Sequence, residues 1–297
     1  MRGLLVTTVI LGMTGCSAQE VEFSHTAKVE SQSRGVVMLD DAQHANVGML
    51  GNTCMVDLNT GAIPVDVDVA QGEEDLVVDA FDGQTVVVGT GGVFQIDDGT
   101  YFTGGASADG VGVTTARLTT DGVVAVRDAF GDCSVGFPDG SEVGVAGPCA
   151  DASIAVDRTG TLFVANSAGV SAVRADGAVQ LAAGDLVSWD EAADQAYVTT
   201  RGSTEISAMG ADGAVRWTMP VDGEVVSMDD MGNMGAVGVM TRVADGGEFM
   251  ILDGETGAVV TTLMTPAGDP SVVVAPDARS MAFVLPNEVH FLSINLR

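Results

Sequence analysis

A recurring Asp-Gly turn constrains the fold of this chain more than any other feature of its sequence. The pair tolerates the positive φ angles that a two-residue hairpin turn requires. It is repeated at intervals of 41, 37, 36 and 41 residues, at positions 98–99, 139–140, 176–177, 212–213 and 253–254. Such even spacing indicates a repeated unit of about 40 residues.

Residues 151–183 show what one unit contains. Four short apolar runs, separated by tight turns, predict strands over residues 154–156, 162–166, 169–173 and 178–181. A four-stranded meander of this length cannot bury both of its faces alone and needs neighbouring copies. The spacing is that of a β-propeller blade. We therefore expect an all-β fold over residues 21–297, a seven-bladed β-propeller of four-stranded antiparallel blades.

The two ends of this region predict how the ring closes. Residues 271–297 supply only three strands, whereas residues 21–29 form a strand that belongs to no unit. Pairing the two would complete the last blade and remove an exposed sheet edge. We expect the N-terminal strand to close the last blade.

The charge balance limits the partners. The chain has 41 acidic and 12 basic residues, a net charge of −29, and Lys28 is its only lysine. Such a surface repels nucleic acid and anionic lipid, so neither is expected as a partner. The acidity is explained most simply as a property of the whole soluble surface.

The N-terminus resembles a bacterial lipoprotein signal. A positive start is followed by a short apolar run and by Met13-Thr14-Gly15-Cys16. The apolar run is too short for a stable transmembrane helix. The resemblance implies a signal peptide over residues 1–15, lipidation of Cys16 and a tether over residues 16–20. Ser17 fits retention in the outer membrane, facing the periplasm or the cell surface, with the lipid as the sole membrane contact. An ordinary cleaved secretory peptide is the alternative.

Export makes disulfides permissible. With Cys16 assigned to lipid, three cysteines remain, which is an odd number. Cys133 and Cys149 flank a hairpin turn at residues 138–140, so we predict that they form a disulfide. Cys54 is then expected to be a buried thiol.

Two blade ends resemble those of quinoprotein-type propellers, whose pattern is D-x-x-T-G-x-x-x-W. They are Asp212-Gly-Ala-Val-Arg-Trp217 and Asp253-Gly-Glu-Thr-Gly257-Ala-Val-Val. That group includes quinone-dependent dehydrogenases and a scaffold lipoprotein of the outer-membrane barrel-assembly machine. The dehydrogenases are longer, eight-bladed chains with a metal and a stacking tryptophan beside the cofactor. This chain has two tryptophans, so we expect no quinone cofactor. The repeat of about 40 residues, which is quinoprotein-like and WD40-like, supports the fold alone.

A second resemblance suggests a metal. Gly160-Thr-Leu-Phe-Val-Ala-Asn166 is similar to strands of gluconolactonase-type propellers, in which Glu, Asn and Asp hold a divalent cation at the channel mouth. It implies Asn166 as a candidate Ca²⁺ ligand. A turn-forming role is the simpler interpretation of Asn166.

Two further groups of ionisable residues could bind a cation. The densest acidic cluster is not spaced as a calcium-binding loop and is best explained as a solvated loop; it comprises Asp66, Asp68, Glu73, Glu74 and Asp75. His25, His44 and His290 lack metal-binding spacing, although His25 and His290 could be neighbours in the closing blade.

The sequence thus favours a lipid-anchored, extracytoplasmic propeller, monomeric and without a cofactor, that binds a protein or small ligand. An enzyme is the less favoured hypothesis. The alternative is a metal-dependent hydrolase of the lactonase type with its site in the central channel.

Overall fold

The computed structural model describes the chain in segments from residue 21 to residue 296: 21–30, 35–39, 43–49, 52–58, 60, 65–67, 76–81, 84–89, 92–97, 100–103, 113–119, 121–129, 131–149, 151–157, 159–244, 246–265, 268 and 270–296. The expected signal peptide, Cys16 and the tether lie outside these residues.

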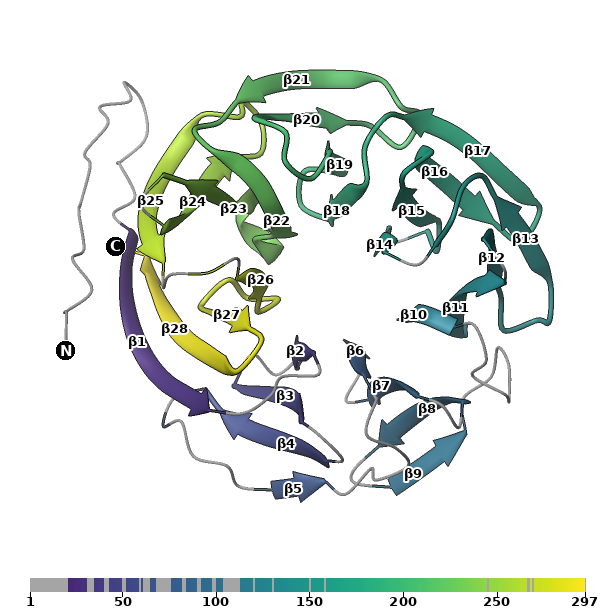
Figure 1. Cartoon of the computed structure of the whole chain (residues 1–297), viewed down its shortest axis with the longest axis horizontal. Coiled ribbons are helices and arrows are strands. Elements are labelled where there is room, and N and C mark those ends of the chain that lie inside the picture. The colour runs from purple at the N-terminus through teal and green to yellow at the C-terminus, as the bar shows by residue number, and fades with distance from the viewer. Residues whose placement is uncertain are drawn as a thin grey trace.

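The described strands form seven four-stranded antiparallel sheets arranged in a ring around a central opening (Figure 1). Six of these sheets consist of four consecutive strands each, and one is composite. The first strand of each consecutive set lies nearest the centre, and the fourth lies at the outer rim (Figure 1). The fold is therefore an all-β propeller with four-stranded antiparallel blades.

The blades are numbered in chain order. Blade 1 comprises β2 (Val36–Met38), β3 (His44–Met49), β4 (Asn52–Asp57) and β5 (Val65–Val67). Blade 2 comprises β6 (Leu76–Phe81), β7 (Gln84–Gly89), β8 (Gly92–Asp97) and β9 (Thr100–Thr103). Blade 3 comprises β10 (Val113–Thr119), β11 (Gly122–Ala129), β12 (Asp132–Gly136) and β13 (Glu142–Val145).

The second half of the ring repeats this plan. Blade 4 comprises β14 (Ser153–Val156), β15 (Leu162–Asn166), β16 (Gly169–Arg174) and β17 (Gly177–Ala182). Blade 5 comprises β18 (Leu186–Asp190), β19 (Gln195–Thr199), β20 (Glu205–Met209) and β21 (Val215–Pro220). Blade 6 comprises β22 (Glu224–Asp230), β23 (Ala236–Val243), β24 (Gly246–Asp253) and β25 (Val259–Thr265), with a 3-10 turn, η1 (Gly232–Met234), after β22.

The composite sheet, called the closing blade here, joins the two ends of the described chain. Its strands are β26 (Ser271–Val274), β27 (Ser280–Leu285), β28 (Glu288–Leu296) and β1 (Val21–Glu30), and β1 is the outermost of them. β1 runs antiparallel to β28 in a register that places Val21 opposite Leu296 and Glu30 opposite Glu288. The expected pairing of the first strand with the last blade is confirmed.

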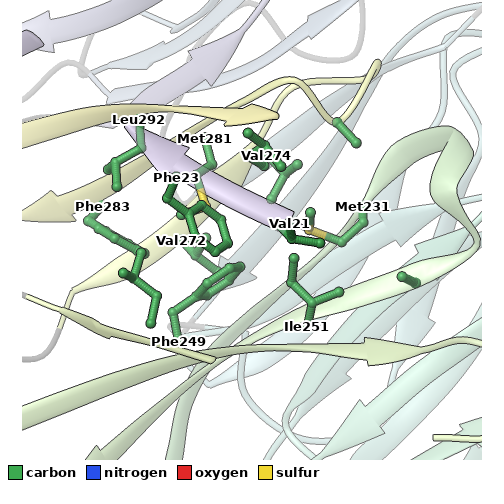
Figure 2. Packing of buried hydrophobic residues seen from close by; sticks show 14 of the residues in the cluster. Val21, Phe23, Met231, Phe249, Ile251, Val272, Val274, Met281, Phe283 and Leu292 are labelled. Carbon is green, nitrogen blue, oxygen red and sulfur yellow. The ribbon is translucent and has the colours of Figure 1, made fainter. Parts of the chain in front are cut away.

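Apolar side chains between adjacent sheets form the core. Figure 2 shows the cluster that joins the closing blade to blade 6, in which Val21 and Phe23 of β1 lie over residues of both blades. The ring of Phe249 in β24 contacts both Phe23 and Phe283 in edge-on geometry, with centroids 6.3 Å and 5.6 Å away. Aromatic pairs in this geometry add to the stabilisation from buried area.

The Asp-Gly turns place acidic residues on one face of the disc. The turns at 139–140, 176–177, 212–213 and 253–254 each join the third and fourth strands of a blade, as expected; the pair at 98–99 lies outside the described residues. In an antiparallel meander these turns share a face with those between first and second strands. We call this the turn face. Its exposed acidic residues include Asp121, Asp139, Asp176, Glu191, Asp194, Asp212 and Glu255.

One strand extends further than the sequence indicated. The apolar pattern predicts that the first strand of blade 6 ends at Met228, but β22 continues through Asp229 and Asp230. Both aspartates keep ladder positions, opposite Gly238 and Val237 of β23. Hydropathy alone did not reveal that these polar residues belong to the strand, because an apolar pattern does not include aspartates that line the centre of the ring.

Among the residues described, none forms a helix long and apolar enough to span a membrane.

Candidate functional site

The central channel contains a cavity of about 490 Å³. It is lined by the first strands of blades 1, 3, 4, 5 and 6 and by β26 of the closing blade. Its polar and charged lining residues are Thr115, Arg117, Ser153, Ser188, Trp189, Arg201, Asp229 and Asp230.

Polar side chains of the inner strands fasten neighbouring blades together. The Ser153 hydroxyl donates to the carbonyl of Val187 at 3.0 Å and accepts from the Val187 N–H at 3.2 Å, which ties blade 4 to blade 5. The Val272 N–H donates to the Ser227 hydroxyl at 3.1 Å, which ties blade 6 to the closing blade. These hydroxyl groups satisfy backbone groups that would otherwise be unpaired inside the ring.

Asp229 and Asp230 are an acidic pair in the described channel wall, and the pKa values of both are raised. Asp229 accepts from the Val274 N–H of the closing blade at 2.8 Å, and Asp230 accepts from the Gly232 N–H at 2.8 Å. Burial raises the pKa of both carboxyl groups, because the charged forms lose hydration. The negative charge of Asp230 raises the pKa of Asp229 further, and the Arg117 guanidinium partly offsets this effect.

A second polar network lies between blades 5 and 6. The fully buried Asp190 accepts from the Tyr197 hydroxyl at 2.6 Å and from the Ala193 N–H at 2.9 Å. Gln195 donates to the Gly254 carbonyl at 2.6 Å. Burial first, and then the bond to Asp190, raises the pKa of Tyr197, so this phenol stays protonated. The network therefore acts as a hydrogen-bonded brace between blades 5 and 6.

This brace supports a hollow on the turn face. A second cavity, of about 460 Å³, lies between blades 5 and 6 and is lined by Ala192, Ala193, Gln195, Arg216, Met234, Gly235, Asp253 and Glu255. Arg216 is held by bonds to the carbonyls of Ala193 and Asp194, each at 2.8 Å. A fixed guanidinium beside two carboxylates offers a partner a charged and polar surface.

The blade-end tryptophan of the quinoprotein-like motif has a structural role. Trp217 donates from Nε1 to the Gly254 carbonyl at 2.7 Å, which links blade 5 to blade 6. A Cβ atom at Gly257 would lie 2.9 Å from the Trp217 ring, so the glycine of the motif leaves room for the indole.

Trp189 occupies a different position. Its ring stacks on Phe163 of blade 4 with centroids 4.9 Å apart, and the residue is 4% exposed. Its Nε1 is buried without a hydrogen-bond partner among the described residues. A buried donor without a partner is costly and calls for an explanation.

Asn166 lies at the end of β15 as a turn-forming residue. Its Nδ2 donates to the Ala146 carbonyl at 2.8 Å, and its Oδ1 accepts from the Ala168 N–H at 2.8 Å. Asn166 is buried and is not among the residues that line the central cavity. Within the described part of the chain, no three His, Cys, Asp or Glu side chains gather as a metal site.

The other residues that the sequence singled out lie apart from the channel. His25 and His290 are neighbours in the closing blade, with ring centroids 5.7 Å apart, and His290 contacts Glu288. His44 lies in β3. Asp66 lies in β5, whereas Asp68, Glu73, Glu74 and Asp75 fall outside the described residues.

The cysteines among the described residues belong to blade 3 and blade 1. The structure joins Cys133 of β12 to Cys149, with their Cα atoms 5.1 Å apart. Cys54 is buried in β4 and takes no part in this disulfide.

Sequence reasoning missed the residues that define the channel chemistry: Arg117, Trp189, Asp229 and Asp230. The one available signal was the pair of consecutive aspartates directly after an apolar run at the first-strand position of a blade.

Comparison with known proteins identifies the fold. The chain is similar to the β-propeller domain of Cps50 (Swd1) from Myceliophteria thermophila, with a TM-score of 0.68 and 14% identity over 92% of this chain and 100% of that one. No family model matches the sequence, and a search of curated proteins finds no match. The likeness shows that the fold is a β-propeller.

Proposed function

We propose that this chain is an extracytoplasmic binding scaffold that docks a basic protein surface on its turn face. The observation that carries the proposal is the placement of acidic turn residues from successive blades on one side of a closed disc. Asp139, Asp176 and Asp212 occupy equivalent turns of blades 3, 4 and 5 and are all exposed. Charges arranged on one face attract an oppositely charged partner and orient it during encounter.

The rigidity of the disc supports this role. Several polar side chains of the inner strands bond to backbone groups of neighbouring blades, as described above for Ser153, Ser227 and Asp229. A partner therefore meets preformed turns, which lowers the entropic cost of binding. The hollow beside Arg216 adds a site on the same face that a partner side chain could fill.

The proposal includes the location. The lipoprotein-like N-terminal segment supports attachment through a lipidated Cys16 at the outer membrane, which would confine the disc near membrane-bound partners.

The test compares matched charge variants of the two faces. Neutralising three turn-face residues (Asp139→Asn, Asp176→Asn, Asp212→Asn) should weaken partner capture from native membranes and reduce its salt dependence. Neutralising three exposed residues of the opposite face (Asp132→Asn, Glu205→Gln, Asp222→Asn) should leave both unchanged. Equal effects of the two sets would contradict docking on the turn face.

A parallel assay separates binding from catalysis. The same protein is offered a panel of lactones and esters with and without Ca²⁺. Metal-dependent turnover that is abolished by Asp229→Asn or Asp230→Asn would overturn the scaffold proposal and support a hydrolase with its site in the channel.

A further inference from the structure

The central cavity combines features of a ligand site that are independent of the turn face. Six inner strands line it, and its volume of about 490 Å³ is within the range of small-molecule pockets. Two neighbouring carboxylates, Asp229 and Asp230, lie in its wall. The question is which kind of molecule these groups would recognise.

The carboxylates favour a cation. Each already accepts a backbone N–H, but these bonds do not offset the loss of hydration or the mutual repulsion of the pair. The charges around them include the Arg117 guanidinium, whose field favours their ionised forms, and the carboxylates of Asp190 and Glu191, whose fields oppose it. Arg201 also lines the cavity. The four acidic groups outnumber the two arginines, so a bound cation would relieve the repulsion.

The remaining lining groups favour oxygen atoms on the same ligand. The hydroxyl groups of Thr115 and Ser188 line the cavity, and neither has a hydrogen bond within the described residues. Ser188 is 6% exposed, so its hydroxyl is a buried polar group that a ligand could satisfy. A hydroxyl group both donates and accepts hydrogen bonds, so it suits a hydroxyl oxygen of the ligand.

We propose that the central channel binds a small hydroxylated amine, such as an amino alcohol or an amino sugar derivative. The ammonium group pairs with Asp229 and Asp230, and the hydroxyl groups bond to Ser188 and Thr115. Two carboxylates on one strand suit a protonated amine better than a metal ion, for which no third acidic, histidine or cysteine ligand gathers among the described residues.

Binding is coupled to proton release. Burial and mutual repulsion hold protons on the pair, and the cation displaces them. For each proton displaced, the affinity for the cation rises up to about tenfold per pH unit. The rise ends at the pH at which the two carboxyl groups are already ionised in the free protein.

The test uses glucamine and sorbitol, which differ only in an ammonium group replacing a hydroxyl. Titration calorimetry should show one glucamine bound per chain, with affinity that rises with pH, and no binding of sorbitol. Asp230→Asn should weaken glucamine binding by about tenfold or more, since it removes one partner of a charge-assisted bond. The surface control Asp132→Asn should have no effect, because Asp132 is exposed at the start of β12 and does not line the cavity.

A second variant isolates the oxygen contacts. Ser188→Ala removes a hydroxyl group that lines the cavity, and it should weaken glucamine binding several-fold without lowering the unfolding temperature. Three results would overturn the proposal: no binding of glucamine, equal binding of sorbitol, or equal weakening by Asp132→Asn and Asp230→Asn, which would indicate counterion attraction to the acidic surface.

Discussion

Phe23 of the first strand lies edge-on against Phe249 of blade 6, with ring centroids 6.3 Å apart and planes at 82°. The contact joins the beginning of the described chain to a residue more than 200 positions away in sequence. It shows that β1 completes the core between two blades as well as the hydrogen-bond ladder of its own sheet (Figure 2).

This contact predicts a large effect of a single truncation. Phe23 is 5% exposed, so Phe23→Ala should lower the free energy of unfolding by about 3–5 kcal/mol. Denaturant titration of the purified domain measures the loss. Val179→Ala on the outer strand of blade 4 is the control, because Val179 is 64% exposed and should change stability by less than about 0.5 kcal/mol. Equal losses would mean that β1 is not part of the core.

The disulfide of blade 3 is testable directly. A non-reduced digest should contain a peptide pair linked through Cys133 and Cys149. The two residues are 16 positions apart, so replacing both with alanine should cost about 3 kcal/mol of unfolding free energy. Cys54→Ala, in blade 1, should leave the linked peptide unchanged. A link that includes Cys54 would show that the strand pairing in blade 3 is wrong.

The channel pair predicts a pH dependence of stability. The folded protein holds protons on Asp229 and Asp230 that the unfolded chain releases above their ordinary pKa of 3.8. Unfolding therefore releases protons in the window above that value, and these two groups lower the free energy of unfolding as pH rises through the window. Below pH 3.8 both states are protonated and the penalty is absent.

Asp230→Asn removes one titrating group and keeps an oxygen acceptor for the Gly232 N–H. The variant should gain stability relative to the wild type as pH rises from about 4.5 to 8, measured by denaturant titration across that range. Asp212→Asn serves as the control, and its free energy of unfolding should differ from that of the wild type by the same amount at every pH. If the difference in unfolding free energy between Asp230→Asn and the wild type is also the same at every pH, the raised pKa of Asp230 is contradicted.

The fold was more predictable from the sequence than the site was. The Asp-Gly turns fix the third and fourth strands of each blade by local chemistry, and the unpaired strand at residues 21–29 predicted the closure. Asp229 and Asp230 could not be recognised in this way. Their role depends on Val274 of the next blade, on Arg117 three blades away and on burial, all of which arise only when the ring forms.

The lipoprotein-like segment predicts a change of location on one substitution. Cys16→Ser should convert the protein from a detergent-extracted membrane form into a soluble or uncleaved product, because the thiol is the expected site of lipid attachment. Fractionation with mass spectrometry of the N-terminal peptide measures this. Recovery of the wild-type protein entirely without lipid from the soluble periplasm would show that the segment is an ordinary secretory signal.

The central claim is that the first and last strands of the described chain share one sheet, and cross-linking tests it most directly. Ser24 of β1 lies opposite Ser293 of β28, whereas Glu288 lies opposite Glu30. A variant with Ser24→Cys and Ser293→Cys should be joined by a short bifunctional thiol reagent, because opposing Cβ atoms lie about 5 Å apart.

The control pairs Ser24→Cys with Glu288→Cys, which the register separates by roughly 20 Å along the strand. We predict that mass spectrometry finds the linked peptides in the first variant and not in the second. Absence of the link in the first variant, or equal yields in both, would contradict a ring closed by β1.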